Sequence, residues 1–262
     1  MLNILVCVKQ VPDINLVKMD PVTGSLIRAG VPAILNPLDA NALEAAVRVK
    51  EAHGGSITVI TMGPDMAKEA LRECLAAGAD RAVLLSDRAF ANADTLATSY
   101  VIVSAAKMLG DFDLIFCGKE SLDGATGQMG AQLAQRFEAA QVTGTLLIKE
   151  VNEEAKTAVV ERELEDGVET LEVKLPCLFT MEKVNYPARI PNLKGKLAAK
   201  KAVITTITAD DIPGLDRGRI GDPGSPTKVP RMFPPVMPEP GIIIDEGSVE
   251  ASVAKLMQLI KD

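Results

Sequence analysis

The chain runs Asp113-Leu-Ile-Phe-Cys-Gly118 and then Lys119-Glu-Ser-Leu-Asp-Gly-Ala-Thr-Gly-Gln-Met-Gly130, the most informative passage of the sequence. The pattern predicts a short buried strand, a loop of glycine and small polar residues, and a helix from Gln128 to Ala139. Such a turn presents unpaired backbone N–H groups and the positive end of a helix dipole, which both attract phosphate. The glycine spacing matches neither a dinucleotide fingerprint nor a P-loop, so an ordinary turn is an equally good interpretation of these residues alone.

Composition indicates a globular protein with a substantial core. The 262 residues suit one large α/β domain, or one domain with an appendage, and 47% are apolar while 24% are charged. The net charge of −7 argues against nucleic-acid binding, which needs a basic face. The apolar run from Ile4 to Val8 is too short for a signal peptide, and no run is long enough to insert into a membrane. We therefore expect a cytoplasmic protein.

The residue types needed for metal binding or nucleophilic catalysis are scarce. The four cysteines, Cys7, Cys74, Cys117 and Cys177, are scattered without a C-x-x-C pair, and the one histidine is His53. Free cysteines in apolar runs behave as small hydrophobes. Histidine-based metal sites and Ser-His-Asp hydrolysis are disfavoured. The sequence therefore predicts neither a metal site nor catalytic residues.

The first half of the chain alternates apolar runs with helical patterns. The predicted strands are Asn3–Lys9, Ser56–Met62, Arg81–Ser86 and Leu114–Gly118. The predicted helices run from an Asp39 cap to Lys50, from Pro64 to Ala77, and from an Asp94 cap to Met108. This alternation predicts a three-layer, Rossmann-like α/β fold with a parallel sheet and right-handed crossovers. Ligands of such sheets collect at the carboxyl ends of the strands.

The second half has a different organisation. Alternating runs around Asp166-Gly167 predict a β-hairpin over residues 157–175, and Pro176–Met181 predicts one more buried strand. The stretch Lys183–Lys201 is basic, contains no acid and is predicted to be a loop. From about residue 205 the chain is rich in proline and glycine, and a short amphipathic helix, Glu246–Ile260, follows. We expect this arm to cross the surface of a partner; a mobile tail is the alternative.

Several motifs together resemble the beta subunit of electron transfer flavoproteins. They are Cys7-Val-Lys-Gln-Val-Pro-Asp13, Asn36-Pro-Leu-Asp-Ala-Asn-Ala-Leu-Glu44, Met62-Gly-Pro64, Ala76-Ala-Gly-Ala-Asp-Arg81, the 118–128 loop and the lysines that end at Lys200-Lys201. The resemblance spans the chain and implies a fold of the adenine nucleotide alpha-hydrolase-like kind. It implies a nucleotide- or flavin-binding domain over 1–204, with a recognition loop at 183–196. The arm, 205–262, would pack on an alpha subunit that carries FAD.

The resemblance also implies which residues bind the cofactor. Backbone of Cys7, Val8 and Lys9 would lie beside the nucleotide, Asn36 and Asp39 would face adenosine, Met62 and Gly63 would line the base or ribose, and Asp123, Gly124, Ala125, Thr126, Gly127 and Gln128 would hold the phosphates. The chain departs from the family at Ala125, where an acid is common. That change removes a negative charge near phosphate.

A subset of the family binds a second FAD, and this chain resembles that subset. The run Phe90-Ala-Asn-Ala-Asp94-Thr95-Leu-Ala-Thr98-Ser99 would lie close to the flavin pyrophosphate, and the tail carries Ile220-Gly-Asp-Pro-Gly-Ser-Pro-Thr227. Asp94 also suits a plain helix N-cap. The resemblance thus implies FAD rather than AMP, with NADH as donor. One electron would pass through the alpha-subunit FAD to a high-potential acceptor and the other to ferredoxin or flavodoxin.

The basic stretch resembles the family's recognition loop. Leu193 stands in the place of the exposed apolar anchor, with Arg189, Lys194 and Lys196 near it in sequence. An aliphatic side chain ringed by basic residues suits a small docking site for an acyl-CoA dehydrogenase-like flavoprotein. A solvated basic surface is the alternative.

Three other functions compete. The first is a non-bifurcating beta subunit with a structural AMP. The second is an ATP-dependent adenylyl-transfer enzyme of the same architecture, although such enzymes use histidines or a Ser-Gly-Gly loop that this sequence lacks. The third is a nucleotide-binding regulatory domain that acts as a homodimer.

Overall fold

The computed structural model describes residues 1–13, 16, 18–19, 26–27, 31–184, 186–230 and 241–261. The chain forms two compact units. The larger comprises Met1–Lys18 with Ile27–Pro230, and the smaller comprises Met19–Leu26 with Arg231–Asp262. None of the described helices is long and apolar enough to cross a lipid bilayer.

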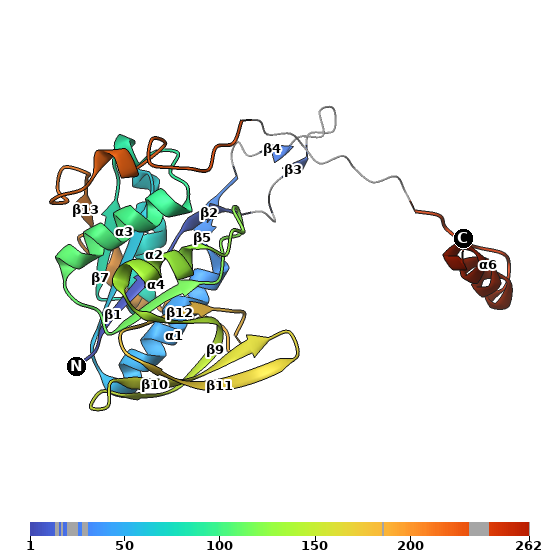
Figure 1. Ribbon diagram of the computed structural model, residues 1–262, viewed down its shortest axis with the longest axis horizontal. Helices are drawn as coiled ribbons and strands as arrows, with labels where there is room; N and C mark the ends of the chain where they lie inside the picture. Colours follow the sequence, from blue (N-terminus) through green and yellow to red (C-terminus); the bar gives the residue numbers. More distant parts are fainter. Residues whose placement is uncertain are drawn as a thin grey trace. The chain divides into compact units, whose positions relative to one another are not determined.

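A mostly parallel sheet forms the centre of the larger unit (Figure 1). Its strands are β1 (Asn3–Cys7), β6 (Ser56–Met62), β7 (Arg81–Leu85), β8 (Leu114–Gly118), β9 (Ala140–Asn152), β10 (Thr157–Leu164), β11 (Gly167–Lys174), β12 (Cys177–Met181) and β13 (Thr205–Ile207). Their order is β11-β10-β9-β12-β8-β1-β6-β7-β13. All neighbours from β9 to β13 in that order run parallel, whereas β9, β10 and β11 pair antiparallel.

Helices cover both faces of this sheet. They are α1 (Pro37–His53), α2 (Lys68–Ala77), α3 (Thr95–Leu109), α4 (Met129–Phe137) and α5 (Leu193–Lys201), with 3-10 turns η2 (Asp65–Ala67), η3 (Arg88–Phe90) and η4 (Arg217–Arg219). Residues of α1 and α2 share one core cluster and residues of α3 and α4 share the other. The predicted three-layer α/β fold is therefore confirmed.

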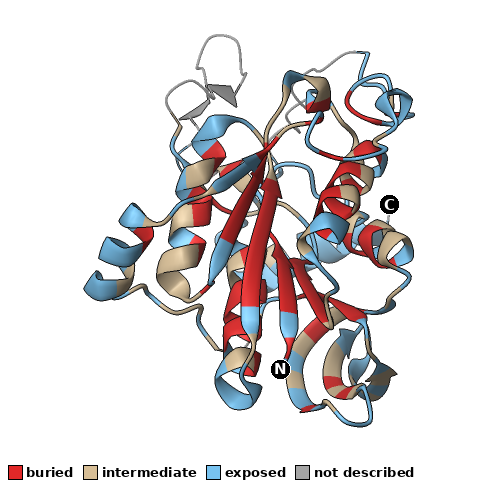
Figure 2. Cartoon of the chain, turned by 90° about the vertical axis from the view of Figure 1, so that its left-hand side faces the viewer, coloured by how far each residue is buried: buried red, intermediate tan, exposed pale blue. Residues whose placement is uncertain are grey.

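Continuous apolar strands follow from this double covering. Ile4 and Val6 of β1 belong to the core on the α1 side, and Leu5 belongs to the core on the α3 side. Figure 2 shows the resulting band of buried strands through the middle of the larger unit. Phe116 and Phe179 on adjacent strands pack with ring centroids 5.3 Å apart. Successive residues of a parallel strand point to opposite faces of the sheet. Because both faces are covered by helices, the strand sequence shows no alternation of polar and apolar residues.

Two local predictions were wrong. The first described helix does not begin at an Asp39 cap, because Pro37 opens it after Asn36 and the Asp39 carboxylate is used elsewhere. The stretch Lys183–Lys201 is not a loop throughout, because its last nine residues form α5. Asn192 caps that helix by accepting a hydrogen bond from Gly195 N at 2.8 Å, and leucine, alanine and lysine then favour helix.

The proline- and glycine-rich tract is folded over its first part. β13 pairs with β7, and Ile207, Ile212 and Ile220 are buried. The larger unit consequently extends to Pro230, beyond the domain boundary expected at residue 204. The predicted hairpin over 157–175 is confirmed, with Leu164 paired to Gly167. The remaining elements are β2 (Gln10–Pro12), β3 (Lys18–Met19), β4 (Leu26–Ile27), β5 (Ala33–Leu35) and, in the smaller unit, α6 (Val249–Lys261).

We predict that Gly130→Ala destabilises the protein by about 1–3 kcal/mol, because α4 lies too close to β12 for a side chain. A Cβ at Gly130 would lie 2.2 Å from Thr180 Cγ2, and Thr180 cannot turn freely because its hydroxyl accepts a hydrogen bond from Gly144 N. Urea unfolding measures the effect. Gly167→Ala is the control, because its Cβ would meet nothing within 4 Å. Equal losses in both variants would contradict the close packing.

Candidate functional site

The candidate site lies where the topology of the sheet reverses. The chain passes from β1 to β6 and β7 on one side, then returns through α3 to β8 on the other side of β1. The switch point therefore falls at the carboxyl ends of β1 and β8, where ligands of doubly wound sheets bind. Cys7, Val8 and Lys9 end β1, and the 119–128 loop follows β8. Met62 and Gly63 end the adjacent β6, at the same edge.

Asp39 joins these two strand ends. Its Oδ2 accepts a hydrogen bond from Lys9 N and its Oδ1 accepts one from Gly118 N, both at 2.8 Å. Burial raises the pKa of the carboxyl to about 7, against the two N–H donors that favour the charged form. A Cβ at Gly118 would lie 2.6 Å from Asp39 Oδ1, so glycine is required for this approach. The side chain thus ties α1 to both strands.

Asn36 fixes the loop that follows β8. Its Nδ2 donates to Glu120 O at 2.9 Å, and its Oδ1 accepts from Leu122 N at 3.2 Å. The side chain is 1% exposed. Both polar groups of Asn36 therefore bind the loop backbone, and its side chain, like that of Asp39, holds the structure around the expected adenosine position.

Lys9 and Asp123 form an ion pair across the site. Lys9 Nζ lies 2.7 and 2.8 Å from the two carboxylate oxygens of Asp123, and 3.5 Å from Ser121 Oγ. Partial burial opposes ionisation, but the hydrogen bonds from Lys9 and Ser121 keep the pKa of Asp123 below its usual value. The carboxylate is therefore ionised and already paired, so its charge repels an incoming phosphate less.

The rest of the loop is exposed and leads into α4. Gly124 to Gln128 are all solvent-exposed, and φ is positive at Ala125 (43°) and Gly127 (62°). Ala125 N donates to Ser121 O at 2.8 Å, which closes a turn. A positive φ is costly for alanine and free for glycine, so this turn is held by its surroundings.

A second helix begins beside the loop. Thr95, the first residue of α3, donates its hydroxyl to Gln128 Oε1 at 2.9 Å, and Gln132 Nε2 donates to Thr95 Oγ1 at 3.2 Å. Among the residues that the structure describes, the buried Gln132 Oε1 has no hydrogen-bond partner. The starts of α3 and α4 are therefore linked through these side chains. Asp94 caps the start of α3, whereas no described side chain caps the start of α4, which keeps unpaired N–H groups and a positive dipole end.

Asp94 connects the start of α3 to the 220–227 motif of the tail. It caps α3 by accepting from Ala97 N at 3.0 Å, and its other oxygen accepts from Thr227 N at 3.0 Å. Its own N–H donates to Ser225 Oγ at 2.8 Å. Burial favours the neutral form of the Asp94 carboxyl, but the hydrogen bonds that the carboxylate accepts hold its pKa below the usual value. Thr98, the next turn of α3, is half-buried and donates its N–H to Asp94 O.

The arrangement fits an anionic group. Both carboxylates near the loop, Asp94 and Asp123, are occupied by donors, and Lys9 is the partner of Asp123, so N–H groups at the start of α4 supply the remaining positive potential. Cys7 and Cys117 are buried, and burial raises the pKa of both thiols far above its usual value, so neither is a nucleophile. The described residues contain no group of three or more metal-ligating side chains placed to hold an ion.

Sequence reasoning missed several members of this site. Ser121, Gln132, Ser225 and Thr227 all contact predicted residues. Ser121 lies within the 113–130 stretch, and Ser225 and Thr227 lie in the 220–227 motif. Gln132 follows Gln128 by one helical turn, a spacing that places both side chains on one face of a helix.

The predicted docking residues lie away from this loop, on segments that contact α1 and α2. Arg189 binds two carboxylates of α1, Glu44 and Glu51. Leu193, at the start of α5, is 73% exposed. Lys194 and Lys196 are exposed and form no ion pair with any residue that the structure describes.

The sequence of this chain matches one family description and is similar to several known proteins. The family description "Electron transfer flavoprotein domain" matches residues 23–212. The chain is 46% identical to "Electron transfer flavoprotein subunit beta" of Thermoanaerobacterium thermosaccharolyticum, over 98% of this chain and 97% of the relative. It is 45% identical to "Caffeyl-CoA reductase-Etf complex subunit CarD" of Acetobacterium woodii, over 100% and 98%. It is 40% identical to "Protein FixA" of Azorhizobium caulinodans, over 99% and 94%.

We predict that Asp39→Asn gains stability relative to the unchanged protein as the pH rises. The folded-state pKa of about 7 lies above the unfolded value of ~3.9, so the folded state holds an extra proton between them and loses stability as it ionises. The difference in free energy of unfolding between the two proteins should move by up to about 2–3 kcal/mol between about pH 5 and about pH 8. The lost N–H acceptor adds a penalty that does not depend on pH.

Urea titrations at both pH values measure this difference. Asp111→Asn, at an exposed position, is the matched control and should show no such change. A difference that stays constant with pH would contradict the elevated pKa of Asp39.

Proposed function

The chain belongs to the electron transfer flavoprotein family, among its beta subunits, and on this premise we propose that it binds FAD at the carboxyl edge of its sheet. As a beta subunit it functions in electron transfer, associates with a flavin or nucleotide, and pairs with an alpha subunit and with dehydrogenase-type partners.

The observation that carries the proposal is the meeting of two helix N-termini through Thr95 and Gln128. A pyrophosphate carries two adjacent phosphates. The uncapped start of α4 would bind one of them, and Thr95 of α3 with Gln128 brings polar groups of two helices within reach of such a ligand. An AMP phosphate needs only the 123–128 loop at the start of α4. The link from Asp94 to the 220–227 motif supports the same assignment, because it fixes the start of α3 beside that loop.

The residues of the chain would bind and orient the cofactor. Backbone N–H groups from Asp123 to Gln128 would hold phosphate, while Lys9 stays close enough to share its charge between Asp123 and the ligand. Asn36 and Asp39 would hold the loop and strand ends in place. A bound flavin supplies the one- and two-electron chemistry, so the protein needs no acid or base of its own.

We further propose that NADH is the electron donor. One electron would leave through the alpha-subunit FAD to an acyl-CoA dehydrogenase-like flavoprotein, and the other would reach ferredoxin or flavodoxin. The similarity to a subunit named for a caffeyl-CoA reductase–Etf complex supports a dehydrogenase-type acceptor. An ordinary carrier with AMP is the alternative.

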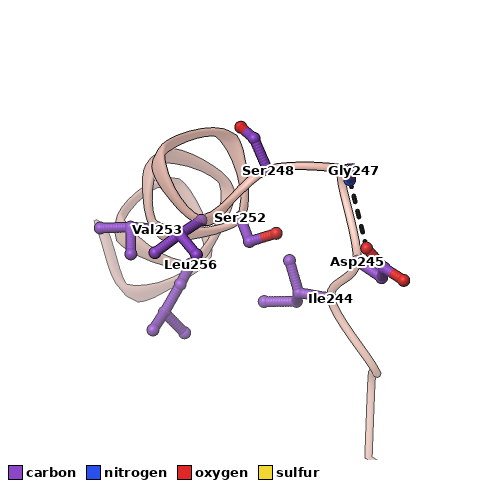
Figure 3. Close-up of a pocket in the computed structure, with 8 residues that line it drawn as sticks. Ile244, Asp245, Gly247, Ser248, Ser252, Val253 and Leu256 are labelled. Carbon is purple, nitrogen blue, oxygen red and sulfur yellow. Dashed lines mark hydrogen bonds between the residues drawn. The ribbon is translucent and has the colours of Figure 1, made fainter.

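The smaller unit supports pairing with another subunit. Within the smaller unit taken by itself, α6 has no buried residue, and Val253 and Leu256 on it are 51% and 45% exposed. Figure 3 shows Ile244, from the segment before the helix, pointing toward the face that carries these two side chains. An apolar helix face left uncovered marks an interaction surface. We propose that the alpha subunit covers it.

We predict that the heterodimer, purified after co-expression with its alpha subunit, releases two FAD and no AMP. Gln128→Glu should lower the affinity for the beta-subunit FAD by about 10-fold, because it adds a negative charge beside the phosphates. The alpha-subunit FAD should remain. Nucleotide analysis and visible absorption of the protein measure both effects.

Gln141→Glu is the matched control, because Gln141 is exposed on β9 and outside the site. One FAD together with one AMP in the purified dimer would assign the chain to the ordinary carriers instead.

A further inference from the structure

Glu44 is a buried carboxylate that receives four hydrogen bonds. Its Oε1 accepts from Arg48 Nε at 2.7 Å and from Arg189 Nη2 at 3.2 Å. Its Oε2 accepts from Arg189 Nε at 2.7 Å and from Arg189 N at 3.1 Å. The residue is 3% exposed. A buried carboxylate with this many donors is ionised and holds its partners firmly.

Glu51 completes the contact with Arg189, two turns later on α1. It accepts from Arg189 Nη1 at 2.7 Å and from Arg189 Nη2 at 3.1 Å. All three guanidinium nitrogens of Arg189 are thus bound to α1. In this arrangement Arg189 anchors its segment, and a partner protein would meet other basic residues.

Two further contacts hold the same segment. The Arg48 guanidinium, already bound to Glu44, lies 4.1 Å from the centre of the Tyr186 ring. At the far end, Arg72 of α2 donates to Ala199 O at 2.9 Å. A Cβ at Gly195 would lie 2.5 Å from Ala76 O, so α5 packs closely on α2. The segment from Tyr186 to Lys201 is therefore fixed at both ends.

The middle of the segment is presented to solvent. Ile190 is 89% exposed, Leu193 73% and Leu197 54%. The whole stretch 183–201 has six basic residues and no acid, in a chain whose net charge is −7. Apolar side chains on a segment that is already ordered lose little entropy when they bind. Their basic surroundings suit a partner with an apolar pocket and an acidic rim.

We infer that Glu44 is a positioning residue, which holds Ile190 and Leu193 in the geometry that an acidic flavoprotein partner recognises. The inference rests on the proposed docking function of this segment. Glu44 itself touches neither the partner nor the cofactor site, so its effect passes through Arg189. Loss of its charge should leave two arginines without their shared counter-ion and free the segment to move.

The test uses the heterodimer, NADH as donor, and a short-chain acyl-CoA dehydrogenase as the titrated partner. Glu44→Gln should raise the KM for that dehydrogenase by about 10-fold, as expected when a docking hot spot is displaced. FAD content, kcat at saturating partner and reduction of ferricyanide should stay unchanged. Leu193→Ala should raise the KM as well. The double variant should show less than the product of the two effects, because both act on one surface.

Glu161→Gln is the matched control, since it removes an acid from the Lys149–Glu161 ion pair on β9 and β10. If Glu44→Gln folds poorly, Glu51→Gln removes half of the Arg189 contact from a 58% exposed side chain and should give a smaller rise in KM. Amide hydrogen exchange over 186–201 should be faster in both variants.

Two results would overturn the inference. One is a normal KM in the Glu44 and Glu51 variants while Leu193→Ala raises it, which leaves docking intact and removes the role of Glu44. The other is a loss of FAD content or of kcat in Glu44→Gln as large as its change in KM, which indicates a general structural role. A normal KM in Leu193→Ala instead removes the docking proposal itself.

Discussion

A single buried carboxylate determines the geometry around the strand ends. Asp39 accepts backbone N–H groups from β1 and from the end of β8, and Gly118 is the residue that allows the approach. The first turn of α1 offers a favourable dipole to this charge, while burial opposes it. The result is a side-chain link from α1 to the ends of both strands at the switch point. Asn36, three residues earlier, extends the same support to the loop beyond β8.

The same helix serves two surfaces. The N-terminal end of α1 holds the candidate cofactor loop through Asn36 and Asp39, and its later turns hold the proposed docking segment, residues 186–201, through Glu44 and Glu51. Between these, Ala42 and Ala46 pack in the core. A helix fixed in a dense core transmits little motion, so both surfaces keep a constant geometry relative to the sheet.

The 119–128 loop lies beside two carboxylates that are already paired. Asp123 is paired with Lys9, and Asp94 is occupied by N–H donors from Ala97 and Thr227. The start of α4, which no described side chain caps, adds the positive end of a helix dipole. Ala125 suits this arrangement because it adds no further charge, although its positive φ shows that the loop is held by its neighbours.

The sequence alone determined the strands β1, β6, β7 and β8, the hairpin around Asp166-Gly167, and the loop that enters α4, because these follow local periods and turn chemistry. Asn192, which caps α5, was also a local signal for a helix, but the many basic residues of this stretch led to the prediction of a loop. Only the tertiary structure decided that Asp39 meets Gly118 and that Glu44 meets Arg189, 79 and 145 residues apart in the chain. A polar side chain has many possible partners, and the path of the packed backbone selects among them.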